Sequence, residues 1–369
     1  TAGAFADRLE AALGGRPPTT PVAHRSETRT TVMARPGSDR VGDRRRSLAL
    51  TVGAIVLAAG AVLAFLLIGG DDGGGGGAVA APTVVTKPVG KSPVGVAVGD
   101  VRIWVASRDA PPPTGGPPGE IYRLRRDSPV QAKEPIPLPG PRAVAVGLSS
   151  VWVVNGEALY EVGGGAVPQP IEVGDKPTDV TVDNNFVWVS NEEGDSVTRV
   201  DPSSIDADGR PTTETIGVGD EPRSIAADRG NVWVANAGSG TVTRIDADRL
   251  KVTATVPVGP QPTSIAVGPS SAWVTDNAED DMREIDVRTA EQVGTPIPVE
   301  PSPRGVAVGL ASVWVASGAA NVVERFDGDS RTRIGDPIAV GPDPADIAVG
   351  VTAVYTANQS SGTVSRILP

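Results

Sequence analysis

A proline followed eleven residues later by an aromatic residue recurs seven times, and this repeat constrains the fold more than any other feature. In each copy the proline precedes a short apolar stretch, a turn and a second stretch that carries the aromatic residue. Successive aromatic positions lie 48, 36, 45, 40, 41 and 41 residues apart, a period typical of propeller blades. The pairs are Pro93/Trp104, Pro141/Trp152, Pro177/Trp188, Pro222/Trp233, Pro262/Trp273, Pro303/Trp314 and Pro344/Tyr355.

The unit around Trp233 shows how each copy is organised. Residues 224–227, 232–235, 241–246 and 251–258 are separated by turns and predict four short antiparallel strands. Asn, Gly and Ser in segment 236–240 supply the turn between the second and third strands. Seven such units predict an all-β fold, a seven-bladed β-propeller over residues 82–369.

The two ends of this region predict how the ring closes. Residues 363–367 match the third strand at 241–245, so the last unit lacks its outer strand. Residues 83–90 match the outer strand at 253–259 and precede the first unit. We therefore expect the N-terminal strand to close the last blade. Closure removes open sheet edges, and it compensates for disulfides, which a chain without cysteine does not form.

Residues 48–68 form an uncharged apolar run of 21 residues, long enough to cross a bilayer. Arg44, Arg45 and Arg46 precede this run, which predicts one transmembrane helix with a cytoplasmic N-terminus. We expect a single-pass protein of the cell membrane, with a disordered cytoplasmic juxtamembrane arm at 16–47, a Gly-rich linker at 69–81 and an extracytoplasmic propeller. A cleaved signal peptide is the alternative, but its charged region would be unusually long.

Composition excludes several kinds of chemistry. The chain has no cysteine and one histidine, His24, so thiolate sites, His-based metal sites and His-containing triads are excluded from the propeller. We predict no catalytic residues, no metal site and no cofactor. Residues 48–369 carry 24 basic and 39 acidic groups, and this negative charge disfavours nucleic acid as a partner.

The Val-Trp-Val-Ala-Asn and Thr-Val-Thr-Arg-Ile-Asp strands and the Gly-x-x-Pro turns resemble YVTN/NHL-type bacterial propellers. The resemblance covers residues 82–369, and the virginiamycin B lyase-like group is the enzymatic member of this class. That group carries its elimination chemistry on histidines and a glutamate. Since residues 82–369 contain no histidine, the resemblance implies the fold without the activity. A lyase-like enzyme and a cell-surface scaffold that binds cell-wall polymer remain the alternatives to a sensor.

Segment 1–15, TAGAFADRLEAALGG, resembles the closing helix of bacterial serine/threonine protein kinases. In such receptors a kinase, a juxtamembrane arm, one membrane anchor and an exported propeller follow in this order. The resemblance implies that the chain is the sensor part of a membrane kinase whose catalytic domain precedes Thr1. Thr28, Thr30 and Thr31 would then be phosphorylation candidates, although a plain charged linker explains them equally well.

The residue after each repeated proline is predicted to lie at the channel mouth. Arginine occupies this position in three blades, and convergent guanidinium groups suit a carboxylate, phosphate or sulfate. The alternative is that these arginines pair with Asp179, Glu221 and Asp346. We expect an extracellular ligand that is an anionic small molecule, peptide or glycan, and ligand-dependent self-association of the receptor. The ligand-binding candidates are Arg142, Arg223, Arg304, Thr178 and Thr263.

Two further repeated positions are predicted to be structural. The aromatic residues should pack the blades together, because buried tryptophan contributes a large apolar area. The short polar residue three positions after each aromatic residue should hydrogen-bond within its own turn.

Overall fold

The computed structural model describes residues 81–108, 119–126, 131, 134–162 and 168–369. The expected helix at 1–15, the arm with Thr28, Thr30 and Thr31, the apolar run at 48–68 and all but the last residue of the linker lie outside the described residues. None of the described helices has the length and apolar character needed to cross a bilayer.

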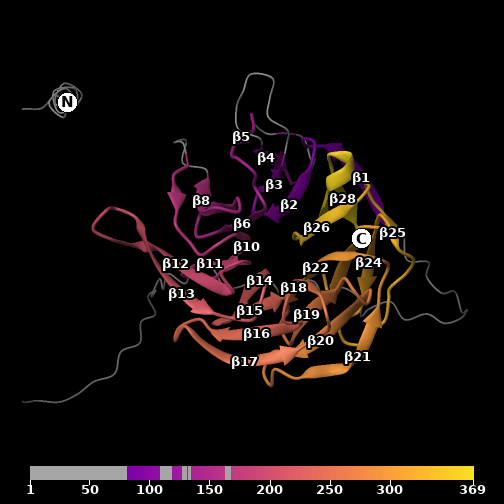
Figure 1. Ribbon diagram of the computed structural model, residues 1–369. Coiled ribbons are helices and arrows are strands. Elements are labelled where there is room, and N and C mark those ends of the chain that lie inside the picture. The colour runs from indigo at the N-terminus through magenta and orange to yellow at the C-terminus, as the bar shows by residue number, and fades with distance from the viewer. Residues whose placement is uncertain (1–80, 109–118, 127–130, 132–133, 163–167) are drawn as a thin grey trace, which may run out of the picture. The chain divides into compact units, whose positions relative to one another are not determined.

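Seven four-stranded antiparallel sheets surround a common centre, and their first strands lie innermost (Figure 1). This confirms the predicted seven-bladed propeller. Blade 1 contains β2 (Pro93–Val98), β3 (Arg102–Ser107), β4 (Glu120–Arg125) and β5 (Ile136–Pro137), and blade 2 contains β6 (Ala143–Gly147), β7 (Ser150–Val154), β8 (Leu159–Val162) and β9 (Pro170–Ile171). Blade 3 contains β10 (Pro177–Val182), β11 (Val187–Asn191), β12 (Ser196–Ile205) and β13 (Pro211–Gly217). Blade 4 contains β14 (Pro222–Asp228), β15 (Asn231–Asn236), β16 (Thr241–Asp246) and β17 (Lys251–Pro257).

The last three blades follow the same pattern. Blade 5 contains β18 (Pro262–Val267), β19 (Ser271–Asp276), β20 (Asp281–Asp286) and β21 (Gln292–Pro298). Blade 6 contains β22 (Pro303–Gly309), β23 (Ser312–Ser317), β24 (Val322–Phe326) and β25 (Ile338–Ala339). Blade 7 contains β26 (Pro344–Val349), β27 (Val354–Asn358), β28 (Thr363–Leu368) and β1 (Thr83–Pro88), with the short 3-10 helix η1 (Gln359–Ser361) between β27 and β28.

Strand β1 supplies the outer strand of blade 7, as predicted. It runs antiparallel to β28 over its whole length, from the pair Thr83–Leu368 to the pair Pro88–Thr363 (Figure 1). The hydroxyls of Thr86 and Ser365 lie 2.9 Å apart across this pair. Val89 follows directly, is 2 % exposed and packs in the core between blades 7 and 1. The first and last strands of the ring are therefore joined by a hydrogen-bonded ladder and by apolar contacts.

The apolar core lies between neighbouring blades, and each repeated aromatic residue faces the next blade. Trp188 of blade 3, for example, packs with Ile225 of blade 4. Each aromatic residue lies on the second strand and pairs with a small residue on the first strand of its own blade, such as Ala226 opposite Trp233. Size complementarity of this kind leaves room for the indole at close packing. The prediction that the aromatic positions pack the blades together is confirmed.

Several arginines of the third strands also join neighbouring blades. The guanidinium of Arg244 lies 5.6 Å from the ring centre of Trp233 and donates to the carbonyl of Val287 in blade 5. Arg199 likewise contacts Trp188 and donates to the carbonyl of Ala247 in blade 4. Cation–π contacts and interblade hydrogen bonds thus reinforce the apolar seams.

Asparagine stands three positions after the aromatic residue in blades 3, 4 and 7, and there its amide bonds to hydroxyls of the third strand. The Asn236 amide donates to the hydroxyls of Thr241 and Thr243, at 3.1 and 2.9 Å. Asn191 and Asn358 make the equivalent pairs in blades 3 and 7. The predicted capping of the turn's own backbone is found at Asn155 and Asp276, which accept hydrogen bonds from backbone N–H groups two and three residues further on, whereas the buried Ser317 hydroxyl has no hydrogen-bond partner among the described residues.

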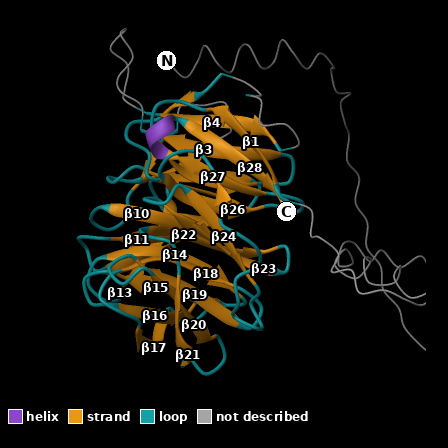
Figure 2. Cartoon of the chain, turned by 90° about the vertical axis from the view of Figure 1, so that its right-hand side faces the viewer, coloured by secondary structure: helices purple, strands orange, loops and turns teal. Residues whose placement is uncertain are grey.

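The propeller has two faces that carry different parts of the repeat. The face at which the first strands begin carries the repeated prolines and is called the proline face. The opposite face carries the turns between first and second strands, with Val101 and Val351, and is called the valine face. Figure 2 shows η1 and the C-terminus at opposite faces of the disc. Since Thr83 pairs with Leu368 and Ile367 with Val354, the chain enters the propeller at the valine face.

Substitution of Val89 by Asp is predicted to lower the free energy of unfolding by about 3 kcal/mol or more, because it buries an unpaired charge at the closing seam. Urea denaturation of the two proteins measures the difference. Val101→Asp is the matched control, since this side chain is 72 % exposed and should change stability by less than about 0.5 kcal/mol. Equal losses in the two variants would contradict the role assigned to the seam.

Candidate functional site

The residue after the repeated proline is a bulge residue in six blades. The pairing of first and second strands shifts register between Pro222 and Ser224, and equivalent shifts occur in blades 1, 3, 5, 6 and 7. A bulge leaves the extra residue outside the ladder and re-aims its side chain. The sequence predicted the position of these residues on the proline face, but it did not predict the bulges.

Two positions on the proline face of each blade combine one larger and one smaller side chain: the residue after the proline and the residue four positions after the aromatic residue. Where arginine follows the proline, the residue four positions after the aromatic residue is small: Gly156, Ala237 and Gly318 accompany Arg142, Arg223 and Arg304. A Cβ atom on Gly156 or Gly318 would lie 2.8 Å from the Nε of Arg142 or Arg304. The other four blades combine a smaller residue after the proline with Arg108, Glu192, Asn277 or Gln359 at the second position.

Two of the three predicted arginines line one cavity of about 290 Å³ on the proline face. Thr263 lies between them in sequence, one blade from each, and its hydroxyl donates to the Gln261 carbonyl. The side chains of Arg223 and Arg304 are 37 % and 40 % exposed. The described lining carries two cations, several hydrogen-bonding groups and no carboxylate. It comprises Arg223, Gln261, Thr263, Asn277, Ser302, Arg304 and Ala345.

Both arginines of the cavity also contact acidic groups beyond its lining. Arg223 lies 3.3 Å from Glu221 and 3.5 Å from Glu192. Arg304 lies 3.2 Å from Asp343. These ion pairs are partly exposed, so each contributes only about 0–1 kcal/mol. A guanidinium has five N–H donors, and the Arg223 Nε has no hydrogen-bond partner among the described residues.

The remaining predicted residues lie outside this cavity. Arg142 lies 3.8 Å from Glu192, which also contacts Lys176 at 3.1 Å. The Thr178 hydroxyl lies within hydrogen-bonding distance of Ser190 in its own blade and donates to the Pro222 carbonyl in blade 4. Arg142 thus belongs to a charged cluster over blades 2 to 4, and Thr178 contributes to an interblade contact.

The expected pairing of the arginines with Asp179 and Asp346 is wrong, whereas that with Glu221 is found. Asp346 accepts hydrogen bonds from the backbone N–H groups of Val96 and Ile347, both at 2.8 Å. Asp179 bonds Val180 and Ile225 in the same way. Each carboxylate therefore joins its blade to the next. The hydroxyls of Ser224 and Ser264 likewise accept hydrogen bonds from backbone N–H groups of the next blade, blade 5 and blade 6 respectively. The sequence did not predict this repeated role.

Burial raises the pKa of both carboxyl groups. The pKa of Asp346 rises to about 7, mainly because the charged form loses solvation, and the nearby Asp179 charge adds to this effect. The pKa of Asp179 is raised for the same principal reason, and its hydrogen bonds partly offset the shift. Asp346 therefore changes its charge near neutral pH, at the seam where blade 7 meets blade 1.

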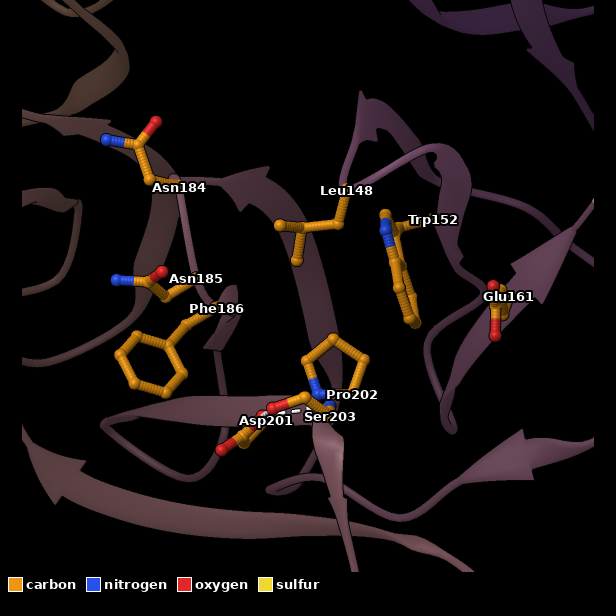
Figure 3. Close-up of a pocket in the computed structure, with 9 residues that line it drawn as sticks. All are labelled: Leu148, Trp152, Glu161, Asn184, Asn185, Phe186, Asp201, Pro202 and Ser203. Atoms are coloured by element: carbon orange, nitrogen blue, oxygen red, sulfur yellow. Dashed lines mark hydrogen bonds between the residues drawn. The ribbon is translucent and has the colours of Figure 1, made fainter.

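A larger cavity of about 610 Å³ lies between blades 2 and 3 towards the valine face (Figure 3). Both carboxylates of its lining are engaged in internal contacts: Glu161 accepts from Ser150, and Asp201 accepts from Ser203 at 2.7 Å. The indole of Trp152 is 1 % exposed. None of the predicted ligand-binding residues lines this cavity, whose described lining is Leu148, Trp152, Glu161, Asn184, Asn185, Phe186, Asp201, Pro202 and Ser203.

Sequence reasoning missed Gln261, Asn277 and Ser302, which complete the lining of the proline-face cavity. Gln261 and Ser302 directly precede repeated prolines, and Asn277 lies four positions after Trp273. A comparison of these two positions with the residue after the proline, blade by blade, shows that large and small side chains alternate between them. That comparison would have identified the lining of the cavity.

Fold and site together define a seven-bladed β-propeller with a cation-lined cavity on its proline face. No family model matches the chain, and no curated protein matches it. Among solved structures, it is similar to virginiamycin B lyase from Staphylococcus aureus, with a TM-score of 0.64 at 14 % identity over 78 % of this chain and 100 % of that one.

Two further structures show the same likeness. A streptogramin B lyase has a TM-score of 0.64 at 17 % identity, over 78 % of this chain and 97 % of that one. Kuenenia stuttgartiensis hydrazine synthase has a TM-score of 0.64 at 14 % identity, over 75 % and 96 %. At such identities the likeness concerns the fold, and it agrees with the propeller type that the repeat motifs resemble.

The raised pKa of Asp346 makes a pH-dependent prediction. A carboxyl whose pKa is raised on folding contributes stability at low pH, and this contribution is lost as the pH rises towards 7. Asp346→Asn removes the titration while keeping the shape of the side chain. The stability of the variant relative to the natural chain should therefore increase by about 1–3 kcal/mol between pH 5 and pH 8. Urea denaturation at both pH values measures the change, and a difference independent of pH would contradict it.

Proposed function

We propose that the propeller is the extracytoplasmic ligand-binding part of a membrane-anchored receptor. The ligand is a small organic acid that binds on the proline face, in the cavity between Arg223 and Arg304. The observation that carries the proposal is the composition of this cavity: two guanidinium groups without a carboxylate in its described lining, in a chain whose net charge is −11.

The arginines favour a carboxylate or another planar or tetrahedral anion. A guanidinium binds such groups through paired, charge-assisted hydrogen bonds. Because the ion pairs of Arg223 and Arg304 are partly exposed, a ligand can share or replace them at small cost. A local cationic cavity on an acidic domain also discriminates against cations, which favour other parts of the surface.

Asn277 and Gln261 add hydrogen-bonding groups to the lining of the cavity. Its amide nitrogen donates to the Gln261 side chain at 3.3 Å, whereas its Oδ1 is buried and has no hydrogen-bond partner among the described residues. The cavity volume of about 290 Å³ lies near the lower end of ligand sites. A hydroxy acid, an amino acid or the end of a peptide fits these features.

The order of segments supports a place in a membrane serine/threonine kinase. An arginine-rich arm, a 21-residue apolar run and a propeller follow one another. The same order occurs in the receptor kinases whose closing helix segment 1–15 resembles. A flexible linker and a single helix transmit a conformational change poorly. Ligand binding would therefore act by changing association of the receptor and the proximity of its kinase domains.

A lyase activity has less support. The inactive variant of the staphylococcal lyase solved with quinupristin carries alanine in place of a histidine. Residues 82–369 of this chain contain no histidine, so a group of that kind is missing from the whole propeller. The structural likeness therefore supports the architecture and leaves the binding function as the better proposal.

Substitution of Arg223 or Arg304 by Ala is predicted to weaken binding of a hydroxy acid or amino acid by about tenfold or more, because each removes a charge-assisted hydrogen bond. Isothermal titration against a panel of such acids measures the affinity. Binding should also weaken as salt is raised, since the ligand is charged.

Arg142→Ala is the matched control, because Arg142 lies on the same face outside the cavity. It should leave the affinity within about threefold of the natural value. Equal losses in all three variants would point to a general effect of surface charge. Unchanged affinity in the Arg223 and Arg304 variants would remove the proposed site.

The reading frame upstream of Thr1 tests the kinase context independently of ligand binding. We expect it to encode a kinase domain with the strand lysine and the catalytic-loop aspartate of that family. Sequencing the gene decides this directly. A frame that begins within a few codons of Thr1 would remove the kinase from the proposal and leave a membrane-anchored binding protein.

A further inference from the structure

The valine face combines exposed apolar side chains with the point at which the chain enters the propeller. Among the described residues, the large apolar side chains with the greatest exposure are Val101, Val351 and Ile205, at 72, 72 and 54 %. Val101 and Val351 lie in the first turns of blades 1 and 7, and Ile205 extends beyond the same end of blade 3. Val101 and Val351 lie on adjacent blades and supply the apolar part of one sector of the valine face.

Three arginines lie beside Val101. Arg102 on β3 pairs with Arg125 on β4, so two like charges face each other across adjacent strands, and Arg126 follows directly. Like charges in this position are destabilising unless an anion lies nearby. Among the described residues, none of the three forms an ion pair with a carboxylate, and the Arg126 Nε is buried without a hydrogen-bond partner. Asp100 is the one described acidic residue in the adjoining turn.

A cavity of about 410 Å³ connects these features. It is open at the valine face and is lined by the first turns of blades 6, 7 and 1, with Leu310, Val351 and Arg126 among its residues. Its lining contains one basic and one acidic side chain, Arg126 and Asp100, and is otherwise apolar or glycine. The blade 7–1 sector of the valine face, defined by Val101, Val351, Arg102, Arg125 and Arg126, is thus both apolar and basic.

The position of Thr83 identifies the partner. Residues 69–82 are fourteen residues that separate the expected membrane anchor from β1, and Thr83 lies at the valine end of blade 7. A Gly-rich chain of this length has an average span of about 20 Å. With the membrane anchorage of the proposed function, a connection of this length would keep the blade 7–1 sector near the bilayer, where apolar side chains can insert between headgroups and arginines attract anionic lipid.

We propose that the blade 7–1 sector of the valine face docks on the anionic surface of the bilayer that anchors the chain. The inference rests on the membrane anchorage in the proposed function. Blade 3 is not part of the contact, because the acidic residues Asp206 and Asp208 follow Ile205. Docking in this orientation leaves the proline face and its cavity directed away from the membrane and open to a soluble ligand.

Fluorescence quenching by lipid tests the orientation in the full chain. The chain has no cysteine, so a single introduced cysteine carries a unique probe. Val101→Cys and Val351→Cys place the probe in the sector. Ser239→Cys places it on an exposed turn of the proline face, and Asp248→Cys on an exposed turn of blade 4 at the valine face. Each labelled chain is reconstituted in vesicles of zwitterionic and anionic phospholipid that contain a headgroup-linked nitroxide.

Quenching at positions 101 and 351 is expected to exceed that at 239 and 248 at least threefold. The excess should fall by half or more in vesicles without anionic lipid, and also when Arg102 and Arg125 are replaced by Gln. Equal quenching at all four positions overturns the proposal. If the excess quenching at positions 101 and 351 is unaffected by removing anionic lipid and by replacing the arginines, the role of the arginines is overturned. Urea denaturation verifies that each labelled variant is folded.

Flotation of the vesicles separates failure of the inference from failure of the proposed function. If the chain floats with the vesicles but shows no excess quenching, membrane anchorage is supported and the docked orientation is contradicted. If the chain does not float, both the anchorage and the docked orientation are contradicted. Titration of hydroxy acids and amino acids against the same preparation tests the ligand site separately.

Discussion

The pairing of β1 with β28 is the interaction on which the rest of the structure depends. It joins strands that are almost the whole propeller apart in sequence and links the last of the seven sheets to the segment that precedes the first. Val89 and the Asp346–Val96 hydrogen bond strengthen the same seam. Because the chain has no cysteine, these non-covalent contacts are what join the first and last strands of the ring.

Closure also fixes the roles of the two faces. The first strands of all blades begin at the proline face, so bulge residues from blades 4, 5 and 6 come together around one cavity although they lie about forty residues apart. The strand that closes the ring begins at the opposite face. The start of β1 and the apolar, basic sector therefore belong to one face, and the cationic cavity belongs to the other.

Much of the fold could be predicted from the sequence, because the repeat is visible in single residues. The aromatic residues mark the second strands, the prolines mark the starts of the first strands, and the missing outer strand of the last unit predicts the closure. The site was predicted less completely. Position alone placed Arg223, Arg304 and Thr263 on one face, but the choice of cavity depends on bulges and on neighbouring side-chain sizes. Asp179 and Asp346 were assigned wrongly because a buried backbone N–H is a partner that no sequence pattern displays.

A designed disulfide across the closing pair tests the central claim most directly. The hydroxyls of Thr86 and Ser365 are 2.9 Å apart, so the double variant Thr86→Cys/Ser365→Cys should form an intramolecular disulfide under mild oxidation, visible in mass and in gel mobility. It should also raise the midpoint of urea unfolding, because the closed loop restricts the unfolded chain. Thr86→Cys/Thr363→Cys is the control, since Thr363 pairs with Pro88 instead. Equal cross-linking in both variants, or none in either, would contradict closure of the ring by β1.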